Sequence, residues 1–259
     1  MSQMALSLFD INQHSVIANP PEGLRIQERI QSGEVGVVRQ FIDSSLTKQI
    51  REYLVAIGQN SLPTYEPIEI GRPNFHRLNF DDERAHVRGC FHQFVFYPWN
   101  QDIFNLFELF GDLFRLKNII SGNEPSRYMG RQGEDEMITR IAFQFYPAGI
   151  GFLNRHQDPY GEHQLTVPTM SLSSKTVDFQ VGGAFIEDGR GTQVILDDYT
   201  APGDVVFFDA RLTHGVAKID PDSNKPWIDF AGRWTCLVAT NKLSHNTEVQ
   251  NARDLGRNW

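Results

Sequence analysis

The sequence contains little cysteine, no excess of positive charge and no long apolar run. Its two cysteines, Cys90 and Cys236, form no C-x-x-C pair, which excludes a disulfide framework and a cysteine zinc site. The net charge of −8 argues against a general nucleic-acid-binding protein, because such a protein needs a basic face for the phosphates. No apolar run approaches the roughly eighteen residues of a membrane span, so we expect no membrane partner.

The start of the chain, MSQMALSLFDINQH, lacks the basic and apolar regions of a signal peptide. Together with the scarcity of cysteine, this predicts a soluble cytoplasmic protein. The length of 259 residues suits a single domain with a sizeable core, and 19 phenylalanines indicate a thickly packed interior. Neither an internal repeat nor a low-complexity linker divides the chain.

The pattern of predicted secondary structure nevertheless changes along the chain. We expect 1–136 to be a mixed, partly helical segment that buttresses a catalytic core at 137–243, with a polar tail at 244–259. The core segment consists of short strand-like runs: MITRIAFQFYP, LTVPTMSLSS, VGGAFIED, TQVILDDY, GDVVFFDA, HGVAKI and RWTCLVAT. Short strands separated by Gly, Pro and Asp indicate an antiparallel β-sandwich or barrel. The prediction is a mainly β fold with flanking helices.

The first part of the chain contains one clear strand pattern and two helix patterns. GVVRQFI (Gly36–Ile42) resembles a short strand. Asp43 can cap a helix whose apolar residues continue at helical spacing to Ile57, and Gly58 supplies a stop. A second apolar face at helical spacing predicts a helix over 102–116. We expect both helices to pack on a sheet and assign them no catalytic role.

The segment Gly71–Asn100 is rich in arginine, histidine and aromatic residues. It fits a lid over a pocket, or a solvated loop followed by a strand at Phe91–Tyr97. Arg77, Arg88 and His92 are the candidates in it for contact with an acidic or phosphorylated group of a substrate.

Three residues form a set that is compatible with a metal ion. His156 and Asp158 lie two apart in NRHQD, and on an extended strand such residues point to the same side. His214 lies far along the chain, just beyond an apolar strand. Two imidazoles and one carboxylate leave about half of an octahedral coordination sphere open, which suits non-haem Fe(II) that binds a co-substrate and dioxygen. The Glu162 and His163 that follow this motif read as loop residues.

Arg233 is a candidate anion-binding residue. In GRWTCLVAT, Arg233 and Thr235 share one strand face while Trp234 and Cys236 share the other. A guanidinium among apolar residues is unfavourable without an anion. A dicarboxylate co-substrate would supply that anion bidentately. A salt bridge to an internal Asp or Glu is the alternative.

These residues together resemble the Fe(II)/2-oxoglutarate-dependent dioxygenases, especially the prolyl-hydroxylase-like branch. The motif of that family is His-x-Asp, a distant His, and an Arg that is often followed two residues on by Ser or Thr. Here it reads His156-Gln-Asp158, His214 and Arg233-Trp-Thr235. The flanking stretches FQFYPAG and PGDVVFFDARLTHGV are also similar to the family. The resemblance spans 139–240, and the gap between His214 and Arg233 is longer than usual.

The resemblance implies a double-stranded β-helix, or jelly-roll core, that uses Fe(II), 2-oxoglutarate and O2. The far carboxylate of 2-oxoglutarate would meet Arg233 with help from Thr235. Gln144 and Tyr146 share a face with Arg140 on the strand before the metal motif, and that face would contact the co-substrate or substrate. Halogenases of the family replace the carboxylate ligand with a small residue. Asp158 therefore favours hydroxylation, or another oxidation that needs no halide.

Several other functions fit parts of the sequence. A metal-dependent hydrolase or isomerase can use the same jelly roll, and so can a metal-binding module without turnover; neither needs Arg233 for a co-substrate. Within the family, a nucleic-acid demethylase fits poorly because the chain is acidic and GRWTCLVA lacks a second arginine six residues on. A protein hydroxylase remains possible, but the long first segment favours a pocket and a small-molecule substrate.

Overall fold

The computed structural model describes residues 7–256, and most of its regular structure is β. Two short segments lie outside the described residues: 1–6 and 257–259. The first belongs to the start that we expect not to be a signal peptide, and the second is the end of the expected tail. The strands are Leu8–Asp10 (β1), Val35–Val38 (β2), Phe75–Phe80 (β3), Gly89–Phe96 (β4), Met137–Pro147 (β5), Phe152–Gln157 (β6), Thr169–Ser171 (β7), Gly183–Glu187 (β8), Gln193–Ile195 (β9), Val205–Phe207 (β10), His214–Ala217 (β11), Gly232–Lys242 (β12) and Arg253–Asp254 (β13).

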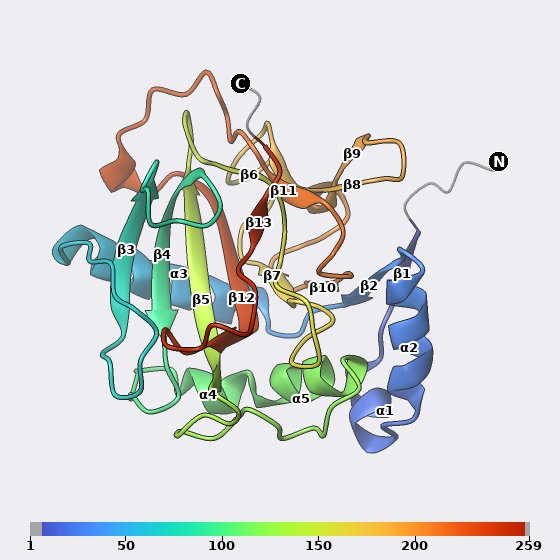
Figure 1. Ribbon diagram of the computed structural model, residues 1–259. Coiled ribbons are helices and arrows are strands. Elements are labelled where there is room, and N and C mark those ends of the chain that lie inside the picture. Colours follow the sequence, from blue (N-terminus) through green and yellow to red (C-terminus); the bar gives the residue numbers. More distant parts are fainter. Residues whose placement is uncertain (1–6, 257–259) are drawn as a thin grey trace.

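These strands form one curled mixed sheet with two facing walls (Figure 1). The first wall has the order β2-β10-β7-β12-β5, and the second has the order β6-β11-β8-β9. β4 joins the walls, because it pairs with β5 along most of its length and with the start of β6 at its own beginning. β3 extends the sheet from β4. The architecture is the predicted jelly-roll core with flanking helices.

Side chains alternate in direction along β5 and β12, so one face of this strand pair lines the barrel interior and the other packs on the outer side. The two strands pair over their full length, from Gly232 opposite Pro147 to Lys242 opposite Met137. One face of the pair carries the apolar residues of the main core, which are Ile141, Phe143, Phe145, Trp234, Cys236 and Val238. The other face carries polar residues that line a cavity between the walls: Arg140, Gln144, Tyr146, Arg233 and Thr235. The period of two in the sequence therefore places the polar set inside the barrel.

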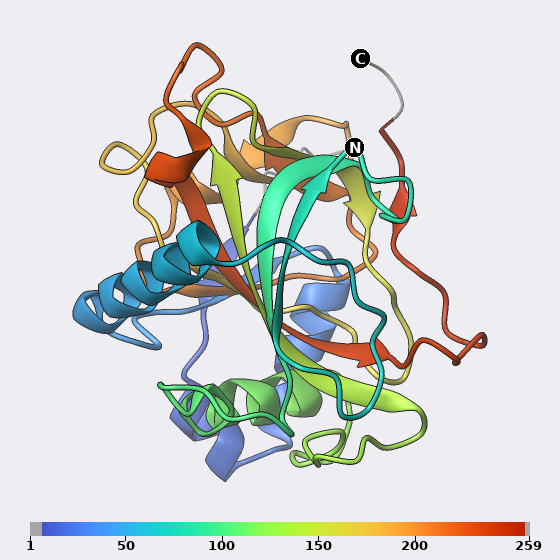
Figure 2. The same cartoon turned by 90° about the vertical axis from the view of Figure 1, so that its left-hand side faces the viewer.

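The helices cover the outer side of the first wall and one edge of the sheet (Figures 1 and 2). α3 crosses the outer side of β3, β4 and β5, while α4 and α5 lie along one end of these strands, with α1 and α2 against α5. The helices are Gln13–Ala18 (α1), Glu22–Gln31 (α2), Ser44–Asn60 (α3), Leu106–Leu109 (α4) and Gly111–Ile120 (α5). None of the helices within 7–256 has the length and apolar character that crossing a bilayer requires.

Three predicted boundaries in the first part of the chain are wrong. Asp43 caps α3 as predicted, since its side chain accepts from the Leu46 N–H, but the helix continues through Gly58. The helix expected over 102–116 is two helices, α4 and α5, which meet at Phe110. The strand expected at Gly36–Ile42 is β2, and it ends at Val38 because the chain then turns toward the helix cap.

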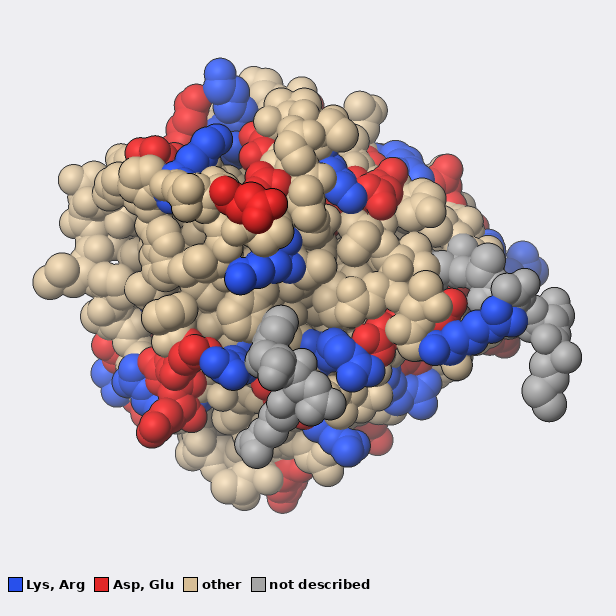
Figure 3. Space-filling model, turned by 90° about the horizontal axis from the view of Figure 1, so that it is seen from above, with Lys and Arg blue, Asp and Glu red and all other residues tan. Residues whose placement is uncertain are grey.

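The segment Gly71–Asn100 contains two strands, one more than predicted. β3 and β4 form a hairpin whose alternate residues face the cavity or the outer core. Within the last segment, β13 pairs with the end of β6. Figure 3 shows acidic and basic side chains interspersed over one face of the molecule, in keeping with the mixed charges of the sequence.

Candidate active site

The three metal-compatible residues come together where β6 and β11 pair. His156 lies directly opposite His214 in the strand register, and Asp158 follows β6 by one residue. One ligand atom of each residue lies within 4.8 Å of the others. Asp158 Oδ1 is 3.6 Å from His156 Nε2, and Asp158 Oδ2 is 3.3 Å from His214 Nε2. The predicted set is therefore assembled in space, with two imidazoles and one carboxylate on one side of an open cavity.

The backbone fixes the orientation of both imidazole rings. His156 Nδ1 donates to the Asn154 carbonyl at 2.8 Å, and His214 Nδ1 donates to the Leu212 carbonyl at the same distance. A carbonyl oxygen can only accept, so each Nδ1 carries the hydrogen and each Nε2 keeps its lone pair for the cavity side when the ring is neutral. Such bonds are typical of histidines that ligate metals.

The electrostatics of the cluster favour an ionised carboxylate. Burial raises the pKa of Asp158, but the charge of His214 and the interactions with both imidazoles outweigh burial and hold the pKa well below its usual range. Burial lowers the pKa of His156, but the Asp158 carboxylate outweighs this effect and raises it. A divalent cation would take the place of these protons, since ligating imidazoles are neutral and ligating carboxylates are ionised.

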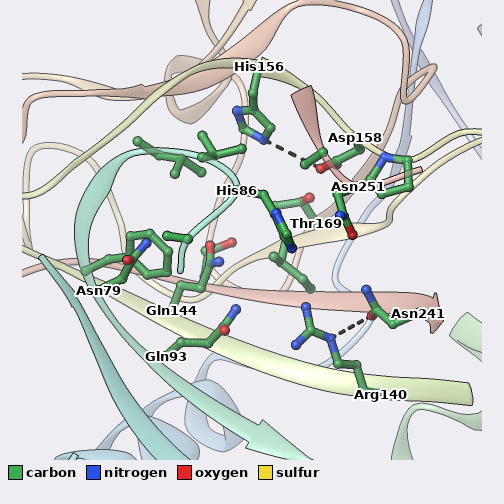
Figure 4. A pocket seen from close by; sticks show the side chains of 18 of the residues that line it. Asn79, His86, Gln93, Arg140, Gln144, His156, Asp158, Thr169, Asn241 and Asn251 are labelled. Carbon is green, nitrogen blue, oxygen red and sulfur yellow. Dashed lines mark hydrogen bonds and ion pairs between the residues drawn. The ribbon is translucent and has the colours of Figure 1, made fainter. Parts of the chain in front are cut away.

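A cavity of about 500 Å³ extends from the metal-compatible residues across the barrel. Figure 4 shows His156 and Asp158 on one side, with Gln93, Gln144 and Arg140 rising from β4 and β5 on the other. Segments 65–68, 85–87 and 249–252 also line the cavity, so residues from both ends of the chain enclose it. This volume suits a small molecule beside a co-substrate.

Arg233 makes the internal salt bridge that the sequence left as an alternative. Its Nε donates to both carboxylate oxygens of Asp197, at 2.9 and 3.0 Å, and both side chains are buried. Arg233 also lines the cavity, and its hydrogen bonds within 7–256 are made by Nε and not by its terminal nitrogens. Thr235 lines the same wall while its hydroxyl donates to the Met170 carbonyl at 2.8 Å. Their role toward a co-substrate stays a prediction.

Gln144 and Tyr146 lie on the cavity wall and contact each other. The Tyr146 hydroxyl donates to Gln144 Oε1 at 2.7 Å. In the strand register Tyr146 lies opposite Arg233, and Gln144 lies opposite Thr235. These four predicted co-substrate residues therefore form one polar patch on the inner face of β5 and β12.

The three residues predicted to contact the substrate separate in the structure. Arg77 of β3 lines the cavity. Arg88 lies outside it, because its exposed guanidinium pairs with Asp81. His92 also lies outside it: its side chain points to the outer face of β4, where it bonds His76 and packs on Phe230. Arg88 and His92 therefore do not line the cavity as expected of substrate contacts: a surface ion pair holds Arg88, and strand alternation turns His92 away.

Several cavity residues were not predicted as site residues. Asn79 and Gln93 reach the cavity from β3 and β4, and Asn241 reaches it from the end of β12. The alternation of the hairpin would have revealed the first two, had its register been known. His163 also lines the cavity, although its motif read as a loop, because the chain after Pro159 folds back toward the barrel.

Comparisons with known proteins bear on the fold. A search of protein-family models and a search of curated proteins each found no match. Among solved structures, a prolyl-4-hydroxylase from Pseudomonas putida has a TM-score of 0.55 at 12% identity, covering 85% of this chain and 98% of its own. This chain has the fold of the Fe(II)/2-oxoglutarate-dependent oxygenases.

Two further solved structures share this oxygenase fold. A prolyl hydroxylase from Trichoplax adhaerens, in complex with a peptide of hypoxia-inducible factor, has a TM-score of 0.51 at 13% identity and covers 90% of this chain and 94% of its own. JOX2, in complex with 2OG, Fe and JA, has a TM-score of 0.52 at 11% identity and covers 96% of this chain and 78% of its own. At these identities the likeness extends to the oxygenase fold and not to the substrate.

Proposed function

We propose that this protein is an Fe(II)- and 2-oxoglutarate-dependent oxygenase that hydroxylates, or otherwise oxidises, an unactivated C–H bond of a small molecule and releases succinate and CO2. The observation that carries this proposal is the His156, Asp158 and His214 cluster. Both imidazoles are oriented by backbone carbonyls, and the cluster opens on a cavity of about 500 Å³ inside an oxygenase fold.

The donor set fits Fe(II). Two neutral imidazoles and one carboxylate on neighbouring strands form a facial triad, which leaves the remaining positions open toward the cavity. The structural zinc sites of proteins are instead closed by four protein ligands, and the described residues bring only three together here. Asp158 supplies the carboxylate, which leaves no position for a halide in its place and favours hydroxylation or another halide-free oxidation.

The polar patch of Arg233, Thr235, Tyr146 and Gln144 fits the far carboxylate of 2-oxoglutarate. Asp197 holds the Arg233 guanidinium through Nε, which leaves its two terminal nitrogens to donate to a carboxylate on the cavity side. Tyr146 offers a second donor beside it if its hydroxyl turns away from Gln144. Asp197 thus acts as a positioning residue, and it also offsets the charge of Arg233 when no co-substrate is present.

When bound, Fe(II) and 2-oxoglutarate would supply the oxidation: dioxygen is reduced, 2-oxoglutarate loses CO2 to become succinate, and the substrate C–H bond is oxidised. The protein contributes orientation and exclusion of water. The cavity walls are largely buried, since Gln93, Gln144, Tyr146 and Thr235 are each at most 5% exposed. A substrate between these walls and the cluster would be held against the metal and shielded from solvent.

The turnover of 2-oxoglutarate tests the proposal. Purified protein supplied with Fe(II), ascorbate, 2-oxoglutarate and air should form succinate slowly, and a screen of small molecules should find compounds that stimulate it. Asp158→Ala should abolish succinate formation while remaining folded by circular dichroism. If the protein binds metal but forms no succinate, either alone or with any compound of the screen, the result would instead favour the hydrolase or the binding module.

A further inference from the structure

The cavity wall that faces the metal-compatible residues carries two arginines without acidic partners. Arg77 of β3 and Arg140 of β5 both line the cavity. Arg140 Nε donates to Asn241 Oδ1 at 2.6 Å, as Figure 4 shows. The Arg77 guanidinium lies 5.0 Å from the centre of the Tyr65 ring, and its buried Nε has no hydrogen-bond partner.

This absence of ion pairs is unusual within the protein. Among residues 7–256, the other arginines that are buried or half-buried pair with an Asp or Glu within 4.0 Å; they are Arg51, Arg72, Arg127 and Arg233. Arg77 and Arg140 are the exceptions. Because a guanidinium removed from water is unfavourable without an anion, an unpaired arginine on a cavity wall indicates a missing negative partner.

The neighbouring carboxylates form no ion pair with either guanidinium within 7–256. Burial lowers the pKa of Arg77 and the charge of Asp82 raises it, but the Asp82 carboxylate itself pairs with Arg84 at 2.6 Å. Two carboxylate residues line the cavity, of which Asp158 belongs to the metal-compatible cluster and Glu66 lies 3.6 Å from Arg72. Lys242 also lines the cavity and adds to its basic character, whereas burial, together with the charges of Lys242 and Arg77, lowers the pKa of His86, which lines it too. Burial lowers the pKa of Arg140 to about 10, so this side chain remains charged at neutral pH.

We infer that the substrate of the proposed oxygenase carries an anionic group, a carboxylate or a phosphate, that Arg77 and Arg140 bind opposite the metal cluster. That the ligand is a substrate rests on the proposed function, whereas the anion site itself does not depend on that function. Buried amide oxygens of Asn79 and Gln93 have no partner and line the same wall, so they would bind a hydrogen-bond donor of the same ligand. Phe75 and Phe91 line the same cavity and add apolar surface to it.

The ligand class is therefore a small organic acid with an apolar or aromatic body. Its anion would lie on the β3–β5 wall, and its body would extend toward His156 and Asp158 (Figure 4). Binding by a guanidinium pair fixes one end of the molecule, which selects the carbon that reaches the metal. The arginines thus act as specificity-determining residues.

The anion site can be tested without metal or co-substrate by three small molecules that share a phenyl ring. They are phenylacetate, phenyl phosphate and the neutral phenylacetamide. Their binding to metal-free protein is measured by ligand-observed NMR. At least one anionic probe should bind and phenylacetamide should bind more weakly, and whichever anion binds tighter identifies carboxylate or phosphate as the source. Arg140→Gln and Arg77→Gln should each weaken the anion by about tenfold or more, because hydrogen bonds to charged groups are the strong ones.

The control is Arg88→Gln, which removes an exposed arginine outside the cavity and should leave probe binding unchanged. Equal binding of the amide and the anions, no binding of either anion, or loss of binding in Arg88→Gln would each overturn the inference. So would a fall in 2-oxoglutarate affinity in Arg140→Gln but not in Arg233→Gln, because the arginines would then serve the co-substrate. The failure of the oxygenase proposal itself would show separately, as absent succinate formation with intact probe binding.

Discussion

At the scale of single residues, the site depends on a few side chains held by specific partners. The two imidazoles owe their orientation to backbone carbonyls two residues earlier in the chain, at Asn154 within β6 and at Leu212 just before β11. Arg233 owes its orientation to Asp197, which reaches it from the 3-10 turn Leu196–Asp198. Side-chain types and spacing predicted the cluster of His156, Asp158 and His214, which the structure brings together, but the partner of Arg233 lies far away in sequence, so nothing local predicted it.

Removal of one imidazole should remove metal affinity. His156→Ala and His214→Ala should each weaken Fe(II) or Zn(II) binding by more than about a hundredfold, since even outer-shell changes at metal sites weaken binding by about 10- to 100-fold. Competition with a metal-responsive dye measures the affinity. His245→Ala, at an exposed histidine beside Glu136, is the matched control and should bind metal like the unchanged protein. Equal affinity in all four proteins would place the metal elsewhere.

The buried pair of Arg233 and Asp197 should matter for stability as well as for binding. Their side chains are only 2% and 3% exposed, so Asp197→Ala leaves a buried guanidinium without its anion. The free energy of unfolding in urea should fall by about 3–5 kcal/mol. Asp112→Ala breaks the exposed pair with Arg115 and should change it by less than about 1 kcal/mol. A similar small change in both variants would contradict the buried character of the pair.

At the scale of elements, α3 continues where the sequence suggested a stop. Gly58 is tolerated inside the helix because the ring of Phe230 occupies the space where a side chain would project. Glycine is a weak helix former and is common just beyond helix ends, so the sequence alone favoured a C-terminal position. The long-range packing of Phe230, which follows the 3-10 turn Trp227–Asp229, overrides that local preference.

Substitution at Gly58 should therefore reverse the usual benefit of alanine in a helix. The new Cβ would overlap the Phe230 ring and approach Phe94, so Gly58→Ala should lower the free energy of unfolding by about 1–3 kcal/mol. At Gly111, the first residue of α5, the nearest atom to a new Cβ is 3.4 Å away. Gly111→Ala should then raise stability by at most about 1 kcal/mol. Thermal unfolding compares the two, and a gain at Gly58 would contradict the packing.

α5 carries a second feature that the sequence did not reveal, a fully buried lysine. Lys117 donates to the Thr240 hydroxyl and the His163 carbonyl, with no carboxylate partner in the part of the chain that the structure describes. Burial lowers the pKa of Lys117 to about 7. In the unfolded chain the pKa is about 10.4, so the unfolded state binds more protons between these values.

That difference in pKa should appear as a rise of stability with pH. Between pH 7 and about 10 unfolding must take up a proton that folded Lys117 does not hold, and this uptake becomes harder as pH rises, which adds up to about 1.4 kcal/mol of stability per pH unit. Urea unfolding at pH 7, 8 and 9 should show a shallower rise in Lys117→Met than in the unchanged protein. Parallel pH profiles would mean that Lys117 stays charged when folded.

At the scale of the whole molecule, the sequence predicted the jelly roll and its metal cluster better than the first third of the chain. Alternating strands and the His-x-Asp motif are local signals, so β5, β12 and the His-x-Asp pair at the end of β6 were visible without a structure, although β6 itself was not among the predicted strands. The hairpin of β3 and β4 was not fully visible, because its register decides which residues enter the barrel. Arg140 was placed on the correct face, but the anion site that it forms with Arg77 depends on two strands joined only through β4.

The central claim is that this fold binds Fe(II) and 2-oxoglutarate together, and an anaerobic absorbance titration tests it most directly. Metal-free protein receives Fe(II) and then 2-oxoglutarate, and the weak visible charge-transfer band of the chelate is monitored. We expect a band that is lost in His156→Ala and needs more 2-oxoglutarate in Arg233→Gln, with His245→Ala unchanged. Bound Fe(II) that gives no band at any concentration of 2-oxoglutarate would contradict the claim.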